Sequence, residues 1–178
     1  MLKKILIALV IIVAGLALVI ALQPATFRVT RTATIAAAPA DVFALVNDFH
    51  NWDAWSPWAK LDPAMKTSFA GSPSGQGAVY SWVGNSDVGE GSMTITDSQP
   101  ANRVNIKLEF IKPFASVADN LFEFAPAADG TTVTWTMSGD NDFLSKAFCL
   151  FTGGMDKMIG PDFEKGLAQM KAAAEAKK

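Results

Sequence analysis

Hydrophobic side chains follow two patterns along the chain: one continuous apolar run at the start, then alternating apolar and polar residues over much of the remainder. The run from Ile5 to Leu22 holds eighteen residues without a charged side chain. As a helix it would be about 27 Å long, which nearly matches the hydrocarbon core of a bilayer. The pattern predicts a membrane anchor over residues 1–24, which crosses the membrane with residues 5–22, and a single domain over residues 25–178.

A cleaved secretory signal is the alternative interpretation of this run, because Lys3 and Lys4 form a basic start and residues 19–21 resemble a cleavage site. The apolar region of such a signal usually has only about 7–15 residues, which favours the uncleaved anchor. Arg28 and Arg31 follow the run, so basic residues flank it on both sides and the positive-inside bias is small. We expect a single-pass protein of a bacterial inner membrane with its domain on the periplasmic side.

The alternating segments predict an antiparallel sheet. Residues 27–35 alternate at the two-residue period of a strand with one buried face. A helix with Pro39 in its first turn follows, and the spacing of Trp52 and Trp55 continues a short second helix up to Pro57. After a loop at residues 71–75, short turn-forming sequences separate five further alternating runs, which predicts a meander. These runs cover residues 78–83, 88–96, 103–110, 117–124 and 131–138.

The last part of the chain has a helical pattern from Phe143 onward. Beyond Gly153 and Gly154, apolar residues recur at spacings of four, four, four and three, which places them on one face of a helix; they are Met155, Ile159, Phe163, Leu167 and Met170. Pro161 either kinks or restarts this helix. The order of elements predicts an α+β fold in which a curved antiparallel sheet wraps around a long C-terminal helix.

Alternation also assigns the two faces of the sheet. Charged residues such as Lys107 and Glu109 share the face that meets water, and the concave face is almost purely apolar. This face and the helix stripe predict an apolar cavity, although the same side chains could fill a solid core. The three tryptophans between residues 52 and 58 likewise suit helix packing or ligand contact. The predicted ligand-binding residues are Trp52, Trp55, Trp58, Tyr80, Trp82, Met93, Phe110, Asn120, Phe122, Trp135, Met155, Ile159 and Phe163.

Few residues offer catalytic chemistry. Tyr80 is the one candidate for a hydrogen-bond donor to a substrate carbonyl, and a buried structural tyrosine is its alternative. Asn120 falls on the inward face, where it could hold a polar ligand head or sit near a strand end. His50 is the only histidine and Cys149 the only cysteine, so we predict no metal and no cofactor, and we expect Cys149 to be a small buried hydrophobe.

Charge excludes one class of partner. The formal net charge is −2, and it becomes −4 when Lys3 and Lys4 are set aside with the anchor. Basic residues do not cluster with aromatic residues as a nucleic-acid surface would require. The partners predicted from the chain are therefore a membrane and a hydrophobic small molecule or lipid, and not nucleic acid.

Three stretches resemble one family. They are FRVTRTATIAAAPADVFALVNDFHNWDAWSPW, GAVYSWVGNSDVGEGSMTI and MDKMIGPDFEKGLAQMK, which together span most of the chain after the anchor. They resemble the polyketide cyclase/dehydrase-like branch of the START-type helix-grip superfamily, also called SRPBCC. The resemblance implies a β-α-α-β6-α order and an apolar cavity for lipids, sterols or polyketides. Only some members of the family are enzymes, and no catalytic set of the family can be carried over residue by residue to this chain.

Three functions are compatible with these features. The first is a membrane-tethered binding or carrier domain for a hydrophobic or amphipathic small molecule. The second is a cyclase or dehydratase acting on a hydrophobic polyketide-like substrate, with Tyr80 and Asn120 polarising a carbonyl. The third is a packed interaction module, which differs from the other two in having no interior void.

Overall fold

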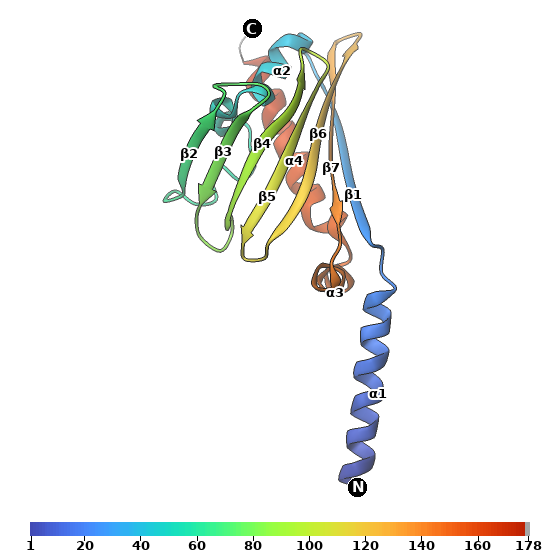
Figure 1. The fold of residues 1–178 in the computed structure, drawn as a ribbon. Coiled ribbons are helices and arrows are strands. Elements are labelled where there is room, and N and C mark those ends of the chain that lie inside the picture. Colours follow the sequence, from blue (N-terminus) through green and yellow to red (C-terminus); the bar gives the residue numbers. More distant parts are fainter. Residues whose placement is uncertain (177–178) are drawn as a thin grey trace.

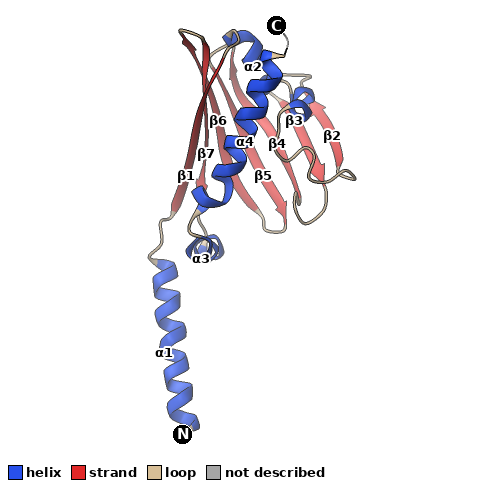
Figure 2. Cartoon of the chain, turned by 180° about the vertical axis from the view of Figure 1, so that it is seen from behind, coloured by secondary structure: helices blue, strands red, loops and turns tan. Residues whose placement is uncertain are grey.

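A computed structural model describes residues 1–176, and these form an α+β fold with an apolar helix before it (Figure 1). The C-terminal helix lies along the concave side of the sheet (Figure 2). The elements are α1 (Leu2–Ala21), β1 (Thr26–Ile35), α2 (Pro39–Asn47), the 3-10 helix η1 (Phe49–Ala54), β2 (Lys66–Gly71), β3 (Ala78–Val83), β4 (Glu90–Gln99), β5 (Arg103–Lys112), β6 (Ser116–Ala127), β7 (Gly130–Asp140), α3 (Phe143–Thr152) and α4 (Met155–Glu175). The predicted fold class is confirmed.

Within the described residues the strands form one seven-stranded sheet in the order β1-β7-β6-β5-β4-β3-β2, with every neighbouring pair antiparallel. Strands β3 to β7 are thus the predicted meander, β2 adds one further strand beyond β3, and β1 joins the opposite edge beside β7. The pairing of β4 with β5 shifts at Gly91 and again after Ile95. Such irregularities bend a strand and increase its twist, which helps the sheet to curl.

Strand β2 is the element that the alternation missed. All six of its residues are exposed, and it forms the free edge of the sheet beyond β3. A strand with no buried face has no apolar–polar alternation to detect, so its sequence KTSFAG looks like a loop. The sixth strand after the helices was implied only by the family resemblance.

Side chains of α4 fill part of the interior between this helix and the sheet. Phe163, Leu167 and Met170 on α4 are buried against the sheet, and α4 continues without a break through Pro161. Gly166 lets the helix approach the sheet closely, because a Cβ atom there would lie 2.9 Å from the Trp135 indole. The stripe predicted from spacing is therefore the packing face of α4.

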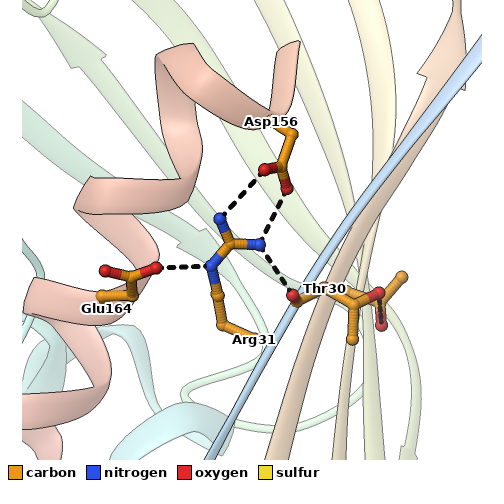
Figure 3. Close-up of polar contacts among 5 residues, drawn as sticks. Thr30, Arg31, Asp156 and Glu164 are labelled. Atoms are coloured by element: carbon orange, nitrogen blue, oxygen red, sulfur yellow. Dashed lines mark hydrogen bonds and ion pairs between the residues drawn. The ribbon is translucent and has the colours of Figure 1, made fainter. Parts of the chain in front are cut away.

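An ion-pair cluster joins the first strand to the last helix (Figure 3). Arg31 on β1 donates from Nε to Glu164 Oε1 at 2.7 Å and from Nη1 and Nη2 to the two carboxylate oxygens of Asp156 at 2.8 and 3.2 Å. Gly160 leaves room for the guanidinium, since a Cβ atom there would collide with it. These hydrogen bonds lower the pKa of Asp156 and raise that of Arg31.

Helices α1 and α3 lie at one end of the domain (Figures 1 and 2). Ile20 is the only buried residue of α1, and both a membrane span and a signal sequence fit the length and composition of this helix. In α3 the Asp142 carboxylate accepts a hydrogen bond from the Ser145 amide at 2.7 Å and so caps the helix. No residue of α3 is buried, and Cys149, predicted as buried, is only half-buried.

Candidate functional site

A cavity of about 380 Å³ lies between the concave face of the sheet, the first turns of α4 and the segment that follows α2. The structure therefore has the void that a solid core would lack. Ten of the thirteen residues predicted to bind a ligand line this cavity, and they are Trp52, Trp58, Tyr80, Trp82, Met93, Phe110, Asn120, Trp135, Met155 and Ile159.

The other three predicted residues lie behind the cavity wall. Phe163 and Phe122 are fully buried and stack on Trp135, with ring centroids 3.8 and 4.9 Å from the indole. Trp55 packs against the same indole edge-on. Alternation assigns a residue to a face but not to a depth along the strand, so it could not separate this packed layer from the lining.

The tryptophan group has a structural role as well. The Trp52 indole donates to the Val46 carbonyl at 3.0 Å, and the Trp55 indole donates to the Leu45 carbonyl at 2.8 Å. Both carbonyls belong to the last turn of α2, where backbone acceptors lack helical partners. These two tryptophans thus fix the end of α2, and Trp52 also presents its ring to the cavity.

Asn120 provides a polar group on the otherwise apolar inner wall. It is only 4% exposed, and its Oδ1 accepts a hydrogen bond from the Trp135 indole at 3.1 Å. Because an indole nitrogen can only donate, this bond fixes the amide orientation and leaves Nδ2 as the free donor. Among residues 1–176 no acceptor pairs with Nδ2, so the cavity wall carries one positioned N–H donor group.

Tyr80 lies farther along the wall, on β3, between aromatic neighbours. Its ring contacts Phe49, Phe69 and Trp82 at centroid distances of 5.9, 5.4 and 6.1 Å. Burial raises the pKa of the phenol, and the negative charge of Asp53 raises it further. The hydroxyl therefore stays protonated and can donate a hydrogen bond, but it is unsuited to act as a base near neutral pH.

Gly91 makes room for one wall residue. A Cβ atom at this position would lie 2.6 Å from the Trp82 ring, so only glycine lets the indole lie across β4. The Trp82 Nε1 donates to the Val88 carbonyl at 2.9 Å, which holds the ring in place. The pairing of β4 with β5 shifts register at this glycine, and the Trp82 indole occupies the space that a side chain would fill.

Sequence reasoning did not nominate several lining residues. Phe27, Leu108 and Met137 carry the strand alternation and could have been added from it. Others lie in connections, in η1, at the ends of β6 and β7, or on α3; they are Asp53, Ser56, Ala59, Met65, Asp87, Val88, Ser116, Asp140 and Ser145. Within the described residues there is no group of three metal-ligating side chains.

The lining of the cavity reaches the surface at the exposed Asp53 and Asp87 and at the end of the sheet nearest α1. Phe27, Val117 and Asp140 belong to strand ends that register pairing places together at that end. Val117 is about half exposed and Asp140 is exposed, so the lining there meets the surface. Asn120, Met93 and Trp135 are buried and form the deeper wall. The site is therefore a mainly apolar pocket with the Asn120 amide in its deeper wall and a mouth toward α1.

A curved sheet gripping a C-terminal helix over an apolar pocket defines the helix-grip class of domains. The family described as polyketide cyclase / dehydrase and lipid transport matches residues 26–175, and the chain belongs to this family. No curated protein matches the chain significantly in sequence.

Solved structures share the fold at low sequence identity. An uncharacterised protein from Rhizobium leguminosarum has a TM-score of 0.61 and 16% identity, with 85% of this chain and 95% of that chain covered. A protein from Mesorhizobium loti has a TM-score of 0.60 and 16% identity over 85% and 99% of the two chains. The di-domain ARO/CYC StfQ of steffimycin biosynthesis has a TM-score of 0.61 and 11% identity over 86% and 52%. At these identities the likeness concerns the fold.

Proposed function

We propose that this protein is a membrane-tethered carrier that holds a hydrophobic or amphipathic small molecule in its cavity. The observation that carries the proposal is the apolar cavity of about 380 Å³, a volume in the range of small-molecule sites. A solid interaction module would not need this space. Burial of about 200 Å² of apolar ligand surface would contribute roughly 5 kcal/mol before the costs of association.

The chemistry of the wall suggests the kind of occupant. Most of the lining is aromatic or aliphatic, so the body of the ligand is a hydrocarbon or a fused ring system. The Asn120 amide requires an acceptor, which a carbonyl, ester or hydroxyl oxygen supplies. A lipid-like molecule with one such oxygen fits both requirements.

The tether in this proposal is α1. We propose that residues 1–24 remain on the mature protein as an anchor in a bacterial inner membrane and that residues 25–178 lie on the periplasmic side. The most apolar 18 residues of the helix have a mean hydropathy of 3.0, and Lys3 and Lys4 lie at its start. Anchoring would raise the local concentration of membrane-derived ligands around the cavity.

Ligand occupancy is the direct test. The full chain, purified in detergent, should release a bound small molecule in native mass spectrometry or take up an added dansyl-labelled fatty acid. A Leu108→Trp variant should reduce uptake, because the larger side chain fills the cavity, whereas Lys107→Trp on the outer face of the same strand should not. Equal uptake by both variants, or no occupant in the wild type, would refute the carrier.

A cyclase or dehydratase is the second candidate. Its supporting observation is that Tyr80 and Asn120 both line the cavity as hydrogen-bond donors able to polarise a carbonyl. The StfQ structure named as an ARO/CYC protein shares this fold. Undiminished turnover of an identified substrate by Tyr80→Phe would remove Tyr80 from this mechanism.

A further inference from the structure

Exposed hydrophobic side chains gather at the end of the domain that carries α1. Seven of the ten exposed large hydrophobic residues between Thr26 and Ala176 lie in two segments there, α3 and the region around the β5–β6 turn. One of the seven, Val117, lines the cavity, and the other six do not. We name these six the apolar rim, and they are Ile111, Phe114, Phe143, Leu144, Phe148 and Phe151. The two segments are about thirty residues apart in sequence and lie at the same end in space (Figure 1).

The pattern within α3 is the reverse of that of a surface helix in water. Leu144, Phe148 and Phe151 follow one another at spacings of four and three and share one helical face. Their exposures are 52%, 54% and 74%, and α3 buries no residue against the domain. The apolar face of α3 packs against no other element and lies at the same end as the apolar β5–β6 turn. An exposed apolar surface of this kind indicates that something covers it when the protein functions.

The position of α1 identifies what covers it. Lys146 on α3 donates to the Ala21 carbonyl at the end of α1 at 3.3 Å, and the Asn141 side chain donates to the Pro24 carbonyl at 3.2 Å. Helix α3 thus contacts the end of a helix that is long and apolar enough to cross a membrane. A membrane that contains α1 would begin where α3 lies (Figure 2).

The same two segments border the cavity mouth. Ser145 of α3 and Ser116 and Val117 beside the β5–β6 turn line the cavity. We propose that the apolar rim lies in the headgroup region of the bilayer that holds α1, so that the cavity opens onto lipid and its occupant enters from the membrane. This inference rests on the proposed role of α1 as an anchor and specifies the surface on which the carrier loads.

Depth-dependent quenching in liposomes tests the contact. Phe114→Cys and Phe151→Cys chains, each in a Cys149→Ala background, would carry an environment-sensitive fluorophore and be reconstituted in phosphatidylcholine. Lipid brominated near the glycerol should cause loss of fluorescence at both positions. Asp129→Cys, exposed at the turn at the far end of β6, is the control and should keep its fluorescence. If labels at 114 and 151 behave like the label at 129, the rim does not touch the membrane.

Two further readouts separate this inference from its alternatives and from the proposed function. A fluorophore at Val10 reports whether α1 is in the bilayer. If that fluorophore is quenched and those at 114 and 151 are not, the membrane contact of the apolar rim is refuted and the anchor role of α1 stands. Disulfide-linked dimers of the unlabelled Phe151→Cys chain would show that a second copy covers the rim, and would likewise overturn the membrane contact.

Transfer kinetics test the loading route. The double variant Phe114→Ser, Phe151→Ser leaves the cavity lining intact and should bind a dansyl-labelled fatty acid from detergent micelles as the wild type does. Its uptake of the same probe from phosphatidylcholine vesicles should be slower. Equal uptake rates from vesicles would contradict loading through the rim, whereas loss of binding in the wild type would refute the carrier itself.

Discussion

The Phe163 ring on α4 lies flat on the Trp135 indole of β7, with ring centroids 3.8 Å apart and 7° between the planes. Phe163 is completely buried, and the same indole lines the cavity. This pair is therefore the point where the helix is held to the sheet and where the filled core becomes the cavity wall. Loss of either ring should therefore lower the stability of the fold and change the shape of the cavity.

Replacement of this ring should be costly. We expect Phe163→Ala to lower the free energy of unfolding by about 3–5 kcal/mol, because a large buried side chain leaves a hole that the neighbours cannot fill. Urea unfolding of the full chain in detergent, followed by tryptophan fluorescence, measures the loss. Phe151→Ala, at a side chain that is 74% exposed, is the control and should change little. Equal effects would contradict the packing role of Phe163.

The Arg31 cluster should make stability depend on pH on the acid side. The hydrogen bond from Arg31 lowers the pKa of Asp156 below its ordinary value of 3.8, and Arg31 keeps its charge throughout. The stabilisation is therefore present above the unfolded-state pKa and is lost as the pH falls through the lower folded-state pKa. Unfolding measured between neutral and acidic pH should show a smaller acid loss for Arg31→Gln than for the wild type.

Asp142 provides the comparison for this pH effect. Hydrogen bonds from the Ser145 backbone and side chain lower the pKa of Asp142, so it contributes an acid-side loss of the same sign. Asp142→Asn should remove the contribution of Asp142 to the loss of stability at acidic pH and leave the contribution of Asp156 unchanged. If the free energy of unfolding falls by the same amount at acidic pH in the wild type, Arg31→Gln and Asp142→Asn, neither carboxylate is coupled to folding.

The Asn120 amide should discriminate between ligands. We expect Asn120→Leu to weaken binding of a ligand that carries a carbonyl by about tenfold, which corresponds to about 1.4 kcal/mol for one lost hydrogen bond. A hydrocarbon probe without an oxygen acceptor should bind with unchanged or improved affinity. Competition against the dansyl-labelled fatty acid gives both affinities. A uniform loss for both ligands would assign Asn120 to cavity shape alone.

Gly91 should control the shape of the wall. A Cβ atom at this position would press on the Trp82 ring, and the indole would have to move from its place across β4. We therefore expect Gly91→Ala to lower ligand uptake and to shift the tryptophan emission. Gly15→Ala, where no neighbouring atom lies within 4 Å, is the matched control. Unchanged uptake by Gly91→Ala would show that the wall tolerates the displacement.

Much of the fold was readable from the sequence because most strands bury one face and most turns carry glycine, proline or asparagine. The inward parity of Asn120 and the stripe on α4 were correct for the same reason. Strand β2 has no buried face and gave no signal. The distinction between Trp52 on the cavity and Trp55 in the core depends on how three elements meet, which local periodicity does not contain.

The link between α1 and β1 has only four residues, from Leu22 to Ala25. Fully extended, they reach about 14 Å at most. If α1 stays in the membrane, the domain cannot travel to a second membrane with its cargo. Such a protein would stay at one membrane. It would release its ligand within the same leaflet or to a mobile acceptor that diffuses to it.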